Sequence, residues 1–124
     1  MEIKIVAIGA AKKGPHQELT DLYLKRLKRW KVSFTCYDIK NVQSPQERRR
    51  LEAQKFLLYF QQRSFVVMLD ETGAHYTSKK FAHFLEHSEV EGVPSITFLI
   101  GGADGFDATL KKKANLCLGF GQQT

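Results

Sequence analysis

The sequence predicts one α/β domain whose mainly parallel sheet is covered by helices on both faces. The chain has 124 residues, 43% of them hydrophobic, which suits one core and is too short for two ordinary domains. Segments with strand-like and helix-like hydrophobic spacing alternate along it, starting and ending with a strand. Two of the strand-like segments are unbroken apolar runs, as in parallel strands that are buried on both faces. This alternation favours right-handed crossovers and a three-layer α/β/α arrangement of residues 1–124.

The first half of the chain predicts two strands and two helices. An apolar run from Ile3 to Ile8 is the first strand, and residues 15–30 then carry apolar side chains at helical spacing, namely Leu19, Leu22, Tyr23, Leu27 and Trp30. Residues 32–37 alternate apolar and polar side chains, which predicts a strand near a sheet edge. Ser44-Pro45-Gln46-Glu47 is a capping box that predicts the start of a second helix, with a core face formed by Ala53, Phe56, Leu57 and Phe60.

The second half predicts three more strands. Residues 64–70 form an apolar run that ends in the carboxylate of Asp70, and residues 95–100 repeat this pattern before a glycine-rich turn. Between them, Ser78 is the expected cap of a third helix. Asp107 is the expected cap of a short fourth helix that ends at Ala114, and residues 116–120 form the fifth strand.

Two loops are the expected ligand positions, because ligands of parallel sheets bind beyond the carboxyl ends of the strands. One follows Asp70, and the other is the turn Gly101-Gly102-Ala103-Asp104-Gly105. Glycines there allow a close approach to a ligand, although tight turns need glycine in any case.

The charge is +6 and is unevenly distributed. Residues 1–63 hold 14 basic and 6 acidic side chains, whereas residues 64–124 hold 5 and 7. This split favours a polyanionic partner such as RNA on one half, with a solvated basic surface as the alternative. Arg48–Arg50 and Lys111–Lys113 are candidate phosphate contacts, although consecutive charges on a helix usually face solvent.

Several other classes of protein are disfavoured. No apolar run approaches the roughly 18 residues of a membrane span, and no signal-peptide layout opens the chain. Cys36 and Cys117 lack a CxxC spacing, so we expect buried, reduced thiols and a cytoplasmic location. His83 and Glu86-His87 match the spelling HxxEH of a zinc hydrolase, but no third ligand is well placed, so we expect a surface helix and no metal.

Four segments together resemble one family over essentially the whole chain. They are residues 4–9, residues 23–27, Val67-Met68-Leu69-Asp70-Glu71-Thr72-Gly73 and Phe98-Leu99-Ile100-Gly101-Gly102-Ala103-Asp104-Gly105-Phe106. In order and spacing they resemble the RlmH (YbeA-like) proteins of the SPOUT class, which are small methyltransferases with an α/β trefoil knot.

The resemblance implies an activity and its site residues. It implies methylation of N3 of a pseudouridine in 23S (large-subunit) ribosomal RNA, with S-adenosylmethionine as cofactor, by a homodimer acting on the assembled ribosome. The implied cofactor-binding residues are Leu69, Gly101, Gly102, Gly121, Gln122, Gln123 and Thr124. The basic residues that would hold RNA are Lys25, Arg26, Arg29, Arg48 and Arg49.

The family pattern continues past the last of these residues into a Pro-His pair, an Arg and a long C-terminal helix. The sequence stops at Thr124, so we expect the knot-threading segment to be truncated here. The alternative to an active enzyme is therefore a basic RNA- or ribosome-binding α/β module without catalytic activity.

Overall fold

The computed structural model describes residues 1–8, 30–37, 44–101 and 108–119. Most of the helix expected at 15–30, and the expected cap Asp107, lie outside these ranges. The elements along the chain are β1 (Glu2–Ile8), β2 (Lys31–Tyr37), α2 (Pro45–Phe60), β3 (Phe65–His75), α3 (Ser78–Val90), β4 (Ser95–Ile100), α4 (Ala108–Lys113) and β5 (Leu116–Gly119). The five predicted strands are therefore all present.

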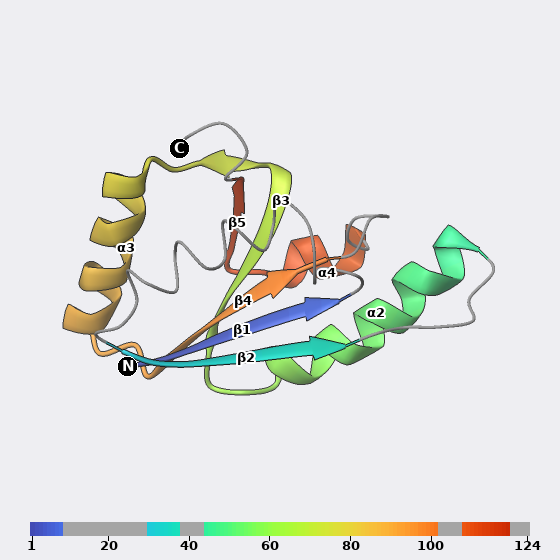
Figure 1. Ribbon diagram of the computed structural model, residues 1–124, viewed down its shortest axis with the longest axis horizontal. Coiled ribbons are helices and arrows are strands. Elements are labelled where there is room, and N and C mark those ends of the chain that lie inside the picture. The colour runs from blue at the N-terminus through green and yellow to red at the C-terminus, as the bar shows by residue number, and fades with distance from the viewer. Residues whose placement is uncertain (9–29, 38–43, 102–107, 120–124) are drawn as a thin grey trace.

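The strands form one sheet in the order β2-β1-β4-β3-β5, and every neighbouring pair is parallel (Figure 1). The predicted parallel α/β fold is thus confirmed. β2 lies at one edge of this sheet and pairs along its whole length with β1, from Glu2 opposite Lys31 to Ile8 opposite Tyr37. The alternating sequence of β2 had predicted this edge position, and Phe34 on it is half exposed.

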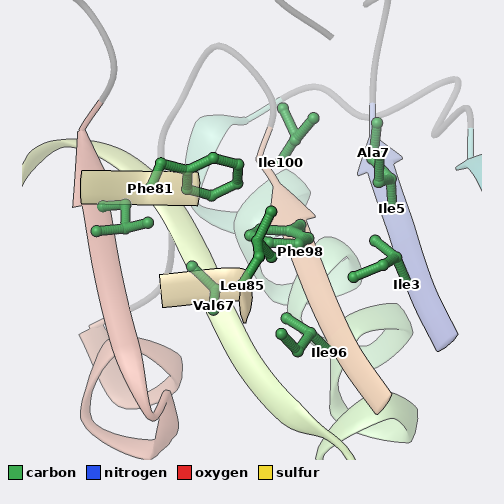
Figure 2. Close-up of a cluster of buried hydrophobic side chains, with 10 residues drawn as sticks. Ile3, Ile5, Ala7, Val67, Phe81, Leu85, Ile96, Phe98 and Ile100 are labelled. Atoms are coloured by element: carbon green, nitrogen blue, oxygen red, sulfur yellow. The ribbon is translucent and has the colours of Figure 1, made fainter. Parts of the chain in front are cut away.

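Helices cover both faces of the sheet, which gives three layers. On one face, Phe81 and Leu85 of α3 pack on side chains of β1, β3 and β4 (Figure 2). On the other face, Phe56 of α2 and Leu110 of α4 pack on Val66, Met68 and Leu99. β4 is buried at all six positions because it lies at the centre of the sheet.

Two helix starts test the capping predictions. Ser44 caps α2, and its hydroxyl accepts a hydrogen bond from the Glu47 backbone N–H at 3.1 Å, as predicted. The predicted cap of α3 was wrong by one residue. Thr77 is the cap, because its extended backbone places its hydroxyl 3.0 Å from the Lys80 backbone N–H, whereas Ser78 already belongs to the helix.

Two further expectations need correction. The third strand does not end at Asp70 but continues to His75, because it resumes pairing with β5 after an irregular stretch. The two cysteines are free thiols, but both are half-buried, since β2 and β5 are the edge strands of the sheet. Among the described residues, no helix combines the length and hydropathy that a membrane crossing requires.

Candidate functional site at the carboxyl ends of three adjacent strands

The sheet order brings the ends of β4 and β5 beside Leu69, the residue at which the regular pairing of β3 stops before the strand continues to His75. Leu69 of β3 is in register with Ile100 of β4 on one side and with Leu118 of β5 on the other. These three residues form a row across the sheet, near the carboxyl ends of β4 and β5. The three strands are parallel, so each continues past the row in the same direction. The predicted loop after β4 therefore starts beside Leu69, and the end of β5 lies on the other side of Leu69. The other predicted loop does not begin at Asp70, because residues 70–75 still belong to β3.

Two of the predicted cofactor residues, Leu69 and Gly101, lie in or next to this row. Leu69 and Gly101 are both half-buried, and Gly101 directly follows the residue that pairs with Leu69. The structure therefore brings these two residues together. The other predicted cofactor residues, Gly102, Gly121, Gln122, Gln123 and Thr124, lie outside the described residues.

Beyond Leu69, the ladder between β3 and β5 is irregular. Both Leu69 and Ala74 are in register with Leu118, so residues 70–73 form a bulge at the carboxyl edge. Gly73 ends the bulge in close contact with β5, where an added Cβ would lie 2.7 Å from the carbonyl carbon and oxygen of Cys117. The sequence reasoning missed this role, although a glycine inside a strand can signal a close backbone approach.

An ion pair holds the first residue of the bulge. The Lys111 Nζ of α4 lies 2.8 Å from the Asp70 Oδ2, and 14% of the Asp70 side chain is exposed against 39% of the Lys111 side chain. Burial, followed by the negative charge of Asp70, raises the pKa of the nearby Cys117 thiol, while the charge of Lys111 opposes this shift. The sequence reasoning had treated Lys111 as a candidate phosphate contact, and no local pattern pointed to Asp70 as its partner.

The predicted RNA-binding arginines lie on the first turns of α2. In Figure 1 this part of the helix extends past the carboxyl ends of β1 and β2. Arg49 donates a hydrogen bond from its Nε to the Pro45 carbonyl at 3.4 Å, and Arg50 lies 3.9 Å from the Glu47 carboxylate. Arg48 and Arg49 are half-buried and Arg50 is exposed. The other predicted RNA contacts, Lys25, Arg26 and Arg29, lie outside the described residues.

The HxxEH segment forms no metal centre in the part of the chain that the structure describes. His83 and His87 are exposed on α3, and the His87 Nε2 lies 3.7 Å from the Glu91 carboxylate of the same helix. Phe81, Phe84 and Leu85 face the sheet and neighbouring rings instead. This arrangement matches the predicted surface helix.

Comparison with known proteins gives one consistent match. A family model described as "Predicted SPOUT methyltransferase" matches residues 1–124. Three similar curated proteins are each named "Ribosomal RNA large subunit methyltransferase H". The one from Paramagnetospirillum magneticum is 37% identical over all of this chain and 81% of its own length. Those from Bradyrhizobium diazoefficiens and Streptococcus gordonii are 35% and 34% identical over all of this chain and 82% of their own lengths.

Proposed function

Because the chain belongs to the SPOUT methyltransferase family, we propose that it methylates large-subunit ribosomal RNA, with S-adenosylmethionine as methyl donor and N3 of a pseudouridine as acceptor. The enzyme class follows from the family. The donor and the acceptor atom go further than the family description, and they rest on the resemblance of the strand-exit and glycine-turn sequences to the RlmH proteins.

The observation that carries the proposal is the adjacency of Leu69 to the ends of β4 and β5. A nucleoside cofactor needs an apolar surface together with backbone groups that it can approach closely. Leu69 supplies a half-buried apolar side chain in this row, and Gly101 supplies half-buried backbone that carries no side chain of its own. These two residues fit a nucleoside at the sheet edge, which is where parallel α/β sheets bind such ligands.

The main task of the protein in methyl transfer is to position the acceptor nitrogen relative to the methyl carbon. Bound S-adenosylmethionine supplies a methyl carbon that is already activated by the sulfonium charge. The chain would therefore hold the acceptor nitrogen in line with that carbon. As the nitrogen–carbon bond forms, the carbon–sulfur bond would break to leave S-adenosylhomocysteine, and the N3 proton would pass to solvent. Rigid strand ends suit this task, because buried β4 and β3 fix where Gly101 and Leu69 lie.

Arg48 and Arg49 on α2 would hold phosphates of the RNA. Their helix reaches past the carboxyl ends of β1 and β2 (Figure 1). Phosphate contacts give affinity and orientation rather than choice of sequence. The choice of nucleotide would then come from the shape of the assembled ribosome. Because that substrate is found in the cytoplasm, the protein would act there. The homodimer implied by the resemblance stays a prediction that light scattering would check.

One experiment tests the donor and the acceptor together. The purified chain is incubated with assembled ribosomes that lack the modification and with S-adenosylmethionine carrying a tritiated methyl group. We expect tritium in large-subunit RNA, and mass spectrometry of the digested RNA should identify a methylated pseudouridine. Calorimetry with S-adenosylmethionine alone should show binding.

Two outcomes would contradict the proposal. Tritium on a different nucleotide would overturn the acceptor while leaving the enzyme class intact. No binding of S-adenosylmethionine at millimolar concentration, together with intact binding to ribosomes, would favour the alternative of a binding module without catalytic activity.

A further inference from the structure

The ion pair between Asp70 and Lys111 joins two elements at the candidate site. Asp70 directly follows Leu69, the residue of β3 that lies in the row of strand ends. Lys111 belongs to α4, the helix that follows the glycine-rich turn after β4. The contact of 2.8 Å therefore connects the exit of β3 to the segment through which the chain passes from β4 to β5.

A second contact holds the same bulge from its other end. The Gly73 backbone lies so close to β5 that a Cβ would meet the backbone of Cys117 and Leu118 at 2.7–2.8 Å. The bulge of residues 70–73 is thus fixed to α4 at its first residue and to β5 at its last. Leu69, just before the bulge, is joined covalently to Asp70 and is also paired with Ile100 of β4 and Leu118 of β5.

The environment favours a defined geometry for the pair. The Asp70 side chain is mostly buried, so its charge needs a close partner, and the partly exposed Lys111 provides one from a helix that Leu110 anchors in the core. A hydrogen-bonded ion pair fixes both the distance and the direction of its partners, which an apolar contact does less strictly. Burial is the main cause of the raised pKa of the Cys117 thiol, and the negative charge of Asp70 close to β5 adds to it.

We propose that Asp70 and Lys111 are a positioning pair for the methyl-transfer site, which sets the spacing between the β3 exit and α4 and thereby the affinity for S-adenosylmethionine. The inference rests on the proposed function. Neither residue is assigned a contact with the cofactor, so the pair acts through Leu69 and the neighbouring backbone.

The test compares variants of Lys111 by calorimetry with S-adenosylmethionine, at a temperature where circular dichroism shows each one folded. Lys111→Met removes the charge and keeps the length of the side chain, and we expect its dissociation constant to rise about tenfold. Lys111→Arg keeps a cation that can reach Asp70 and should stay within about twofold of the wild type. Lys112→Met, on an exposed neighbour of the same helix, is the matched control and should bind as the wild type does.

Enzyme kinetics separate positioning from a merely structural role. With Lys111→Met, the KM for S-adenosylmethionine should rise about tenfold while kcat at saturating cofactor changes less than about twofold. Asp70→Asn, which keeps the shape of the side chain, should show the same split and serves where Lys111→Met does not fold. A variant that only loses thermal stability would leave the KM unchanged.

The outcomes distinguish this inference from the function on which it rests. If the wild type binds S-adenosylmethionine and Lys111→Met or Asp70→Asn binds it equally well, the positioning role is overturned and the proposed function stands. Equal weakening by Lys112→Met would also overturn it, because the effect would then be one of general charge. If the wild type itself does not bind S-adenosylmethionine, the cofactor assignment is wrong, and so is the positioning role of the pair.

Discussion

Glycine is required at position 73 and at position 92 for different physical reasons. At Gly73 the constraint is space, because the β5 backbone occupies the position where a Cβ would stand. At Gly92 the constraint is backbone conformation, because its φ of 80° lies in the left-handed region while the space around it is open. One substitution series can separate the two causes.

We expect Gly73→Ala to destabilise the protein by about 1–3 kcal/mol, since the backbone of β5 must move to accept a methyl group. Gly92→Ala should cost about 1–2 kcal/mol, and Gly92→Asn should cost less because asparagine tolerates the left-handed region. Urea denaturation measures all three. A Gly73→Ala variant as stable as the wild type would show that β5 does not lie against the bulge as described.

At the level of single helices, α2 carries buried core residues and a cluster of arginines on the same segment. Glu52 and Phe56 are its buried residues, whereas Arg48 and Arg49 near its start are half-buried and Arg50 is exposed. The capping box set where the helix begins, and the arginine positions follow from that start. The basic surface of this helix is therefore a local property of the sequence.

We expect the double variant Arg48→Ala/Arg49→Ala to bind ribosomes more weakly and to lower the slope of log K against log salt by about 1 per lost phosphate contact. Its affinity for S-adenosylmethionine should be unchanged. The matched control is Lys79→Ala/Lys80→Ala on α3, which removes two charges from the helix on the opposite face of the sheet. Equal loss in both variants would mean that only net charge matters and that α2 has no special role.

Across the whole molecule, a pair of tyrosines links the edge of the sheet to a helix. The hydroxyls of Tyr37, at the end of β2, and Tyr59, on α2, lie 2.9 Å apart. Burial, followed by the hydrogen bond with Tyr37 and the charge of Tyr37, raises the pKa of Tyr59 from 10.0 to about 12. Folding therefore favours the protonated phenol.

This shift predicts how stability depends on alkaline pH. The unfolded chain loses the Tyr59 proton near its ordinary pKa of 10.0, whereas the folded chain keeps it to about 12. The contribution of this group to stability is therefore complete below pH of about 10 and is lost as the pH rises through about 12. In the wild type, the urea midpoint should therefore fall as the pH rises from about 10 to about 12. Tyr59→Phe should make this fall smaller, whereas the control Tyr76→Phe, on the other face of the sheet, should leave it unchanged. An identical pH profile for Tyr59→Phe and the wild type would contradict the shift.

Much of the candidate site could be located from the sequence, and the rest depended on contacts between distant segments. The ends of two buried apolar runs indicated the ligand edge of a parallel sheet, and the resemblance to the RlmH proteins named Leu69 and Gly101 there. Lys111 was not recognised as the partner of Asp70, because three consecutive lysines on a short helix look alike until the fold decides which of them faces inward.

By itself, the sequence determined the order of the described strands and helices along the chain and the cap of α2, because these features depend on neighbours within a few residues. Only the tertiary structure decided the sheet order, the extension of β3 to His75, the cap at Thr77 and the pairing of Asp70 with Lys111. With the exception of the cap, these features depend on which backbone or charge arrives from far along the chain. Local spacing carries no information about such partners, so the pattern of hydrophobic residues fixes the elements and packing fixes their neighbours.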